Sequence, residues 1–333
     1  MLKYVIKRII SMIPVLLGVI VIVFTLMYVS PGDPAALKLG TEATPEAIAQ
    51  LRAEMGLDRP YLVQLGDYIL GVITRFDLGE SYRTGAEVSA EIVGRIGITL
   101  KLAFISMAVG SVLGIALGIL SAVKQYSFID KIMTVFALFG ISTPSFWLAL
   151  MLILAFSVNL GWLPASGSYG LRYWILPCAT LGYQAAGIIM RMTRSSMLES
   201  IRQDFVTTAR AKGQTEGKII VRHVLRKALI PIITAIGNQF CYLLGGAVLV
   251  ESVFSLPGLG KYLVDGISNL DFPAVTSSVL VIALISVVVM LVLDILYSFV
   301  DPRIKATYQG DALFKARKKA LKEGGEVAHD SKQ

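Results

Sequence analysis

The residue types that carry out covalent or metal chemistry are scarce in this chain. It has two histidines, His223 and His329, and two cysteines, Cys178 and Cys241, which is too few for a metal cluster with a known ligand spacing. The segment Ser255–Tyr262 contains Gly-Lys but lacks the first glycine and the following Ser or Thr of a phosphate-binding loop. No nucleophile elbow or zinc-protease motif occurs either. The sequence therefore predicts no catalytic residue, no metal site and no cofactor bound by this chain.

One carboxylate lies where it would be costly to place it. Asp294 falls inside a charge-poor stretch long enough to cross a membrane, and such a group must face protein or water. We expect a hydrogen bond or salt bridge near the cytoplasmic interface, with a proton relay as the alternative. No series of buried acids or histidines accompanies it to form a proton path.

A strongly polar excursion interrupts the apolar sequence between residues 191 and 227. These 37 residues contain nine basic and three acidic side chains. The pattern predicts a helix over Ile201–Lys212 that ends at Gly213, and a second short helix over Glu216–Arg226 before Pro231 enters the next span. Two helices joined at a glycine form a compact knob suited to a groove on another protein. The alternative is a solvated loop of a membrane protein.

The elements that must position these residues are membrane helices. Of the 333 residues, 55% are hydrophobic and only 16% are charged, a composition unlike that of a soluble domain. Six stretches of 18 or more residues contain no Asp, Glu, Lys or Arg, and each is long enough to cross the hydrocarbon core as a helix. The sequence therefore predicts an all-α membrane protein with six transmembrane helices, over residues 9–29, 98–123, 132–158, 175–190, 228–250 and 274–299.

The distribution of charge sets the orientation of these helices. The loops on the side of the two termini contain 22 Lys and Arg residues and the opposite loops contain eight, whereas acidic residues number nine and 13. Because basic residues accumulate in cytoplasmic loops, we expect a cytoplasmic N-terminus (1–8) and tail (300–333), with external segments at 30–97, 159–174 and 251–273. The first span is longer than the apolar part of a secretory signal, which favours a retained helix. The basic charge thus has a topological explanation that calls for no nucleic acid.

The first external segment, residues 30–97, predicts an ordered cap. Thr44 followed by Pro45 is a typical helix start, and Gly56 is a typical residue just beyond a helix end. A second amphipathic stretch runs over Tyr61–Ile73. Packing on the outer mouth of the bundle is the expected role of this cap.

Three glycines in the second predicted span share one helix face. Gly110, Gly114 and Gly118 repeat every four residues, and such a face lets another helix approach closely. The spacing predicts a helix-packing surface but does not say whether the partner helix belongs to this chain.

The polar loop and several shorter motifs resemble the permeases of bacterial ABC importers, and more narrowly the first membrane subunit of the dipeptide, oligopeptide and nickel group. The loop contributes Phe205–Gly213 and Arg222–Pro231. The other matching segments, which extend over nearly the whole chain, are Ser30–Pro34, Gly56–Pro60, Asp77–Ser81, Thr143–Trp147, Gly161–Gly167, Glu251–Gly260 and Asp301–Arg303. The chain departs from the general importer motif in one respect: Thr207 and Thr208 stand where that motif has an acid and an alanine, although Ala209 and Gly213 are retained.

The resemblance implies a type I importer permease fold in the bacterial plasma (inner) membrane. It also implies four kinds of partner: a second homologous permease, two cytoplasmic ATPases that hold ATP and Mg²⁺, an external solute-binding protein, and membrane lipid. The Arg202–Thr215 region would be the coupling helix that docks on an ATPase. Its candidate docking residues are Asp204, Thr208, Ala209, Arg210, Lys212 and Gly213, and the candidates for the substrate path or a gate are Pro144, Glu251 and Asp294.

The resemblance favours di- or oligopeptides as the substrate. Nickel, glutathione or an oligosaccharide are alternatives, because permeases of this group look alike. Two other classes of protein stay open at this point: a stand-alone channel or gradient-driven carrier, and an intramembrane enzyme. The enzyme is disfavoured because the sequence offers no pair of nucleophile and base.

Overall fold

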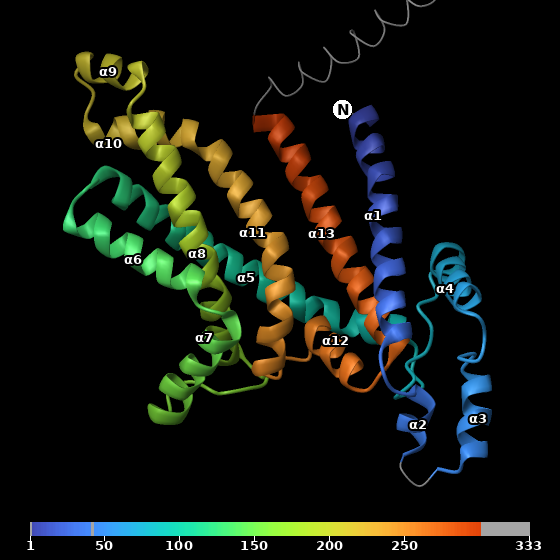
Figure 1. Cartoon of the computed structure of the whole chain (residues 1–333). Helices are drawn as coiled ribbons and strands as arrows, with labels where there is room; N and C mark the ends of the chain where they lie inside the picture. Colours follow the sequence, from blue (N-terminus) through green and yellow to red (C-terminus); the bar gives the residue numbers. More distant parts are fainter. Residues whose placement is uncertain (1, 41–42, 301–333) are drawn as a thin grey trace, which may run out of the picture. The chain divides into compact units, whose positions relative to one another are not determined.

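The computed structural model describes residues 2–40 and 43–300, and Figure 1 gives its course. The chain divides into two compact units, Met1–Met290 and Leu291–Gln333. Within the described residues the regular structure is helical, apart from one isolated bridge between Glu80 and Glu87. The predicted cytoplasmic tail lies outside the described residues from position 301 onward.

Three helices are long and apolar enough to cross a membrane by themselves. They are α1 (Leu2–Val29), α5 (Val88–Val123) and α13 (Phe272–Val300), with the apolar stretches at Arg8–Val29, Val88–Val123 and Phe272–Leu293. These stretches contain the predicted first and second spans and most of the predicted sixth. α5 starts ten residues before the predicted span, and Val88 and Ile92 at its start are buried against Leu259.

The predicted third span, 132–158, is two helices rather than one. α6 (Phe128–Ser142) is followed by α7 (Ser145–Leu152), which continues as the π-helix η1 (Ile153–Asn159), and the axis bends by 107° at the break. Pro144 explains the break, because its ring disfavours helical geometry at the preceding residue. Thr143 accordingly adopts an extended conformation with ψ of 125°.

The fourth and fifth predicted spans lie inside α8 (Leu171–Ile201) and α11 (Leu225–Val253). These two helices are not among the three just named, so the span boundaries 175–190 and 228–250 stay predictions. α8 and α11 are instead central to the packing. Leu181 of α8 and Leu244 of α11 are almost completely buried in one cluster with Leu102 of α5.

The glycine face of α5 packs against α8, so its partner helix belongs to this chain. A Cβ atom at Gly110 would lie 2.7 Å from the Cβ of Ala185, and one at Gly114 would lie 2.8 Å from the Cβ of Ile189. Such distances are too short for carbon atoms, so only glycine allows this approach. The face predicted from Gly110, Gly114 and Gly118 is thus the face on which α5 meets α8.

The external segment contains three helices: α2 (Pro34–Leu39), α3 (Pro45–Glu54) and α4 (Tyr61–Arg75). The predicted start at Thr44 is confirmed, because its hydroxyl accepts a hydrogen bond from Ala47 N at 3.3 Å. Gly56 follows α3 in the left-handed conformation, with φ of 68°. The hydroxyl groups of Tyr68 in α4 and Ser277 in α13 are hydrogen-bonded at 2.9 Å, which joins this cap to the last membrane helix.

The polar loop departs from prediction at both of its helices. The first, α9 (Asp204–Ala211), begins three residues later than expected, because α8 runs on to Ile201. The second does not stand apart from the fifth span. α10 (Glu216–Lys218), the π-helix η2 (Ile219–Val224) and α11 follow one another without a break, since Pro231 lies in a helix that has already begun.

Candidate functional site

The helix α9 presents one face to the protein and the other to solvent. Val206 and Ala209 are buried against Ile219 and Val224, at 1% and 8% exposed. Ala209, a predicted docking residue, therefore anchors α9 on its inner side. The other five predicted docking residues form the exposed side of the turn and can meet a partner: Asp204, Thr208, Arg210, Lys212 and Gly213.

A bidentate ion pair closes the turn that follows α9. Arg210 Nε and Nη2 donate to the two carboxylate oxygens of Glu216 at 2.7 and 3.1 Å. The guanidinium group lowers the pKa of the Glu216 carboxyl, so the pair stays charged at neutral pH. Gly213 lies between the two residues with φ of 73°, a conformation that favours glycine.

Three further contacts hold this knob, which we define as residues 204–216, and the adjoining Gln203 to the start of the long helix. Lys227 Nζ lies 4.2 Å from the ring centroid of Phe205 and 3.2 Å from Gln203 Oε1. His223 Nε2 and Gln214 Oε1 are 2.9 Å apart. The knob is thus attached to η2 and α11 by side chains from both of its ends.

A buried carboxylate at the start of α6 was missed by the sequence analysis. Asp130 accepts two hydrogen bonds from Arg194 of α8, each at 2.8 Å. It also accepts one from the Ser121 hydroxyl at the end of α5 and one from Tyr126 N at 3.0 Å. Arg194 holds the pKa of Asp130 well below its usual range.

This cluster joins α5, α6 and α8 just before the chain enters the knob. A local signal for it was present, because Ser127 and Asp130 have the spacing of a helix capping box. Ser127 does cap α6, accepting from Asp130 N at 3.2 Å. The partner Arg194 is 64 residues away, and no local pattern indicates it.

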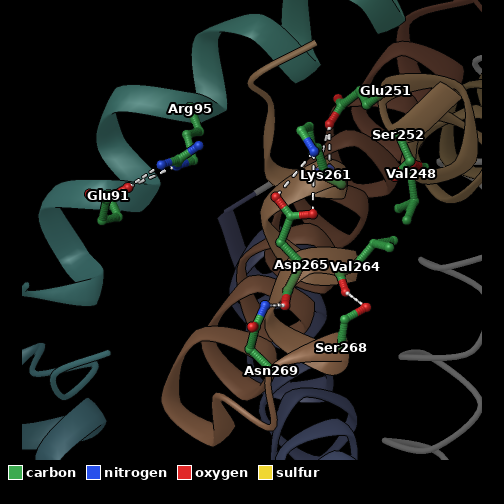
Figure 2. Close-up of polar contacts among 11 residues, drawn as sticks. Glu91, Arg95, Val248, Glu251, Ser252, Lys261, Val264, Asp265, Ser268 and Asn269 are labelled. Carbon is green, nitrogen blue, oxygen red and sulfur yellow. Dashed lines mark hydrogen bonds and ion pairs between the residues drawn. The ribbon is translucent and has the colours of Figure 1, made fainter. Parts of the chain in front are cut away.

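At the opposite end of α11, Glu251 is completely buried. Figure 2 shows its carboxylate beside the first turn of α12 (Leu259–Ser268), where Oε2 accepts from the backbone N–H groups of Gly260 and Lys261 at 2.7 and 3.1 Å. Burial raises the pKa of this carboxyl. Glu251 therefore caps α12 although it lies in the preceding helix. This structural role was not part of the prediction, which named Glu251 as a candidate for the substrate path or a gate.

Two glycines make room for this carboxylate. A Cβ atom at Gly258 would lie 2.6 Å from Glu251 Oε1, and one at Gly260 would lie 2.9 Å from Oε2. Lys261 points instead to Asp265, with 3.2 Å between Nζ and Oδ2, as Figure 2 shows. The segment between α11 and α12 is thus folded around a single side chain.

A second buried carboxylate, Asp271, ties the cap to the start of α13. It accepts a hydrogen bond from the Ser81 hydroxyl and another from Tyr82 N at 3.0 Å. The two other candidates for the path or a gate lie elsewhere in the chain. Pro144 stands directly before α7, at the bend, and Asp294 lies in α13 with its side chain outside the described part of the chain.

Comparison with known proteins gives consistent matches over both halves. The model of the binding-protein-dependent transport system inner membrane component matches residues 114–306, and the model of the N-terminal part of such components matches residues 1–103. The chain is 41% identical to a dipeptide transport system permease protein of Alkalihalophilus pseudofirmus, over 92% of this chain and 100% of the relative. It is 42% identical to a glutathione transport system permease protein of Salmonella choleraesuis, over 92% and 99%.

Two other matches agree with these. A putative peptide transport system permease protein of Brucella abortus is 40% identical over 90% of this chain and 98% of the relative. An inward-facing structure of the MetNI methionine ABC transporter matches with a TM-score of 0.54 and 20% identity, over 64% of this chain and 97% of that one. The likeness in structure shows the fold, which is that of a type I ABC importer permease.

The motifs of the loop, the helical fold and the matches over both halves lead to one assignment. The chain belongs to the family of binding-protein-dependent transport system inner membrane components, the membrane permeases of ABC importers, in which separate subunits hydrolyse ATP.

Proposed function

We propose that this chain is one of two permease subunits of an ATP-driven importer of di- or oligopeptides. It would form the translocation path with a second, homologous permease, receive substrate from an external solute-binding protein and couple to two cytoplasmic ATPases that bind ATP and Mg²⁺. The carrying observation is the similarity over nearly the full length to permeases named for dipeptides and peptides. The exposed knob supports the coupling part of this proposal.

The mechanism follows from how the knob is attached. An ATPase that grips the exposed side of α9 would move η2 and α11 with it, because Val206 packs on Ile219 and Lys227 holds Phe205. Closure of the two ATPases would then draw the two permeases together at the cytoplasmic side and change the access of the cavity from outward to inward. The energy comes from ATP hydrolysis on the partners.

The relative named for glutathione supports a second candidate substrate, since glutathione is itself a small peptide. Nickel and other small solutes are further candidates. The decisive experiment co-expresses the chain with the proteins of its gene neighbourhood, reconstitutes the purified complex in liposomes and measures ATP-dependent uptake of labelled dialanine, glutathione and Ni²⁺. Dialanine uptake is the expected result. A chain that purifies alone and conducts without ATP would instead be a channel or carrier.

The variant Gly213→Pro tests the coupling role of the knob. Proline cannot adopt the positive φ at this position, so the turn is re-aimed and transport is lost while membrane insertion continues. Gly161→Pro is the matched control, because Gly161 also has positive φ and open space around it but lies in a predicted external loop. Normal uptake by the Gly213→Pro complex would contradict the docking role.

A further inference from the structure

A small cavity lies in the external cap, away from both ends of α11. Its volume is about 210 Å³, and the loop after α3, the helix α4 and the start of α13 contribute to its lining. This volume accommodates one amino-acid side chain or a few water molecules, since a water molecule occupies about 30 Å³ in the liquid. The cavity plays no part in the proposed transport mechanism.

Aromatic rings dominate the walls of this cavity. Phe24 and Tyr68 form one pair and Tyr82 and Phe272 form another, each with ring centroids 6.0 Å apart. Burial raises the pKa values of Tyr68 and Tyr82 to about 12, so both phenols are neutral. The faces of such rings attract organic cations, and cages of this kind bind alkylated ammonium groups.

An acidic group, Asp67, lines the cavity together with a basic group, Arg59. Asp67 Oδ2 lies 3.2 Å from Arg59 Nη1, and both side chains are more than half exposed, so the pair holds its two members together only weakly. A carboxylate can accept several hydrogen bonds, which leaves Asp67 able to take a second cation. The surrounding segment 30–97 is itself acidic, with ten Asp and Glu residues against six Lys and Arg.

The rim of the cavity is preformed. Gln64 Nε2 donates to the backbone oxygens of Arg59 at 2.7 Å and of Leu57 at 3.3 Å. These bonds fix the loop that carries Arg59 and Gly56, so little ordering is needed when a ligand enters.

We propose that this cavity binds a protonated amine, inserted between the two aromatic pairs with its N–H groups directed to Asp67. Two sources offer this chemistry outside the cell: a lysine side chain of a protein that docks on the cap, and the amino terminus of a peptide. The site would then recognise charge at the outer surface before any substrate reaches the translocation path.

The test measures charge-selective labelling of a thiol placed in the cavity. The complex with Met55→Cys is treated with methanethiosulfonate reagents that carry either an aminoethyl or a sulfonatoethyl group, and the ratio of the two rates is compared with that of Ala53→Cys on the exposed side of α3. The wild-type complex gives the background from Cys178 and Cys241. We expect the cation-to-anion ratio to be about two- to fivefold higher in the cavity than at the control, as a weak cation–π contact implies.

Further variants keep the test decisive. Met55 lines the cavity and is partly exposed, so a thiol at this position is within reach of the reagents. Adding Asp67→Asn should lower the ratio towards the control value. Equal ratios in the cavity and at Ala53→Cys, as expected for a cavity that holds only water, would overturn the proposal, as would a preference for the anion.

Protection by soluble amines then separates the two sources. Trialanine with a free amino terminus is compared with N-acetyltrialanine, and Nα-acetyl-lysine methylamide with its Nε-acetylated form. Protection by trialanine alone identifies a peptide amino terminus, and protection by the lysine amide alone identifies a lysine side chain. Equal protection by the acetylated compounds, or protection by none, would overturn the amine site. Because labelling requires no transport, failure here leaves the proposed import function intact.

Discussion

The two ends of α11 are held in different ways. At the end predicted to be cytoplasmic, the ion pair between Arg210 and Glu216 is exposed, and the inner side of α9 buries only small apolar surfaces. At the external end, Glu251 and Asp271 are buried and accept hydrogen bonds from backbone N–H groups. Separating a buried carboxylate from its hydrogen-bond donors costs much free energy, whereas an exposed ion pair rearranges easily. The external end is therefore built to stay fixed, and the cytoplasmic end to adapt to a partner.

The largest effect is expected from Gly258→Val at the external end. Gly258 has φ of −96°, so its backbone suits any residue, but a side chain there would collide with Glu251. Overpacking and the loss of the cap on α12 together should lower the free energy of unfolding by more than about 4 kcal/mol. Quantification in isolated membranes should show little folded protein.

The matched change at the cytoplasmic end is Gly213→Ala. There the backbone is strained but nothing lies within 4 Å of a new Cβ, so the cost is about 1 kcal/mol. Normal amounts of folded protein are expected. A Gly258→Val chain as abundant as Gly213→Ala would remove the contrast between the two ends.

The next effect concerns Asp130, which joins α6 to α5 and α8. Asp130→Ala leaves Arg194 without its charged partner and should destabilise the chain by about 3–4 kcal/mol. Because the folded-state pKa of Asp130 is lowered, its contribution is complete above the ordinary pKa of 3.8 and is lost as the pH falls through the folded-state value. Thermal unfolding in detergent should show this difference at neutral pH, and a double-mutant cycle with Arg194→Ala should show strong coupling. Additive effects of the two changes would contradict a direct pair.

A smaller effect, with the opposite dependence on pH, is expected for Glu251→Gln. The amide can still accept from Gly260 and Lys261 without carrying a buried charge. Burial raises the folded-state pKa of Glu251 above its ordinary value of 4.5. The protonated carboxyl therefore contributes its full stability below pH 4.5, and this contribution is lost as the pH rises through the folded-state pKa. The Tm of the wild-type chain should therefore decline relative to that of Glu251→Gln with rising pH. A constant difference between them would show that Glu251 does not titrate in this way.

The smallest effect on stability belongs to Arg210→Ala. Both partners of this pair are exposed, so the Tm should not change measurably. Stimulation of the ATPases by substrate should fall, because the turn after α9 loses its closing contact. A large drop in the Tm of Arg210→Ala together with normal stimulation of the ATPases would contradict this assignment, because it would make the Arg210 end the rigid one.

The sequence predicted those features that depend on near neighbours. Thr44, Gly213 and the glycines of α5 act through spacings of a few residues, and they lie at a helix start, just beyond a helix end and on a packing face. The cradle around Glu251 depends on how the chain turns back over about ten residues between α11 and α12, and the pair of Asp130 with Arg194 joins residues 64 apart, so no helix-spacing pattern reveals either. The bend at Pro144 was predictable in principle, because proline restricts the residue before it. The count of uncharged residues concealed it, since that count measures apolar length and not helix continuity.

The unbroken run of α10, η2 and α11 has a mechanical consequence. From Glu216 to Val253 the backbone is helical without interruption, over a length of about 55 Å. A rod of this length amplifies rotation: a tilt of about 5° pivoting at one tip sweeps the other tip through about 5 Å. Glu251 fixes the end of the helix that lies next to α12, so the helix pivots there. The knob lies at the opposite end and moves. A push of a few ångströms on the knob thus needs only a small change of angle where the rod is anchored.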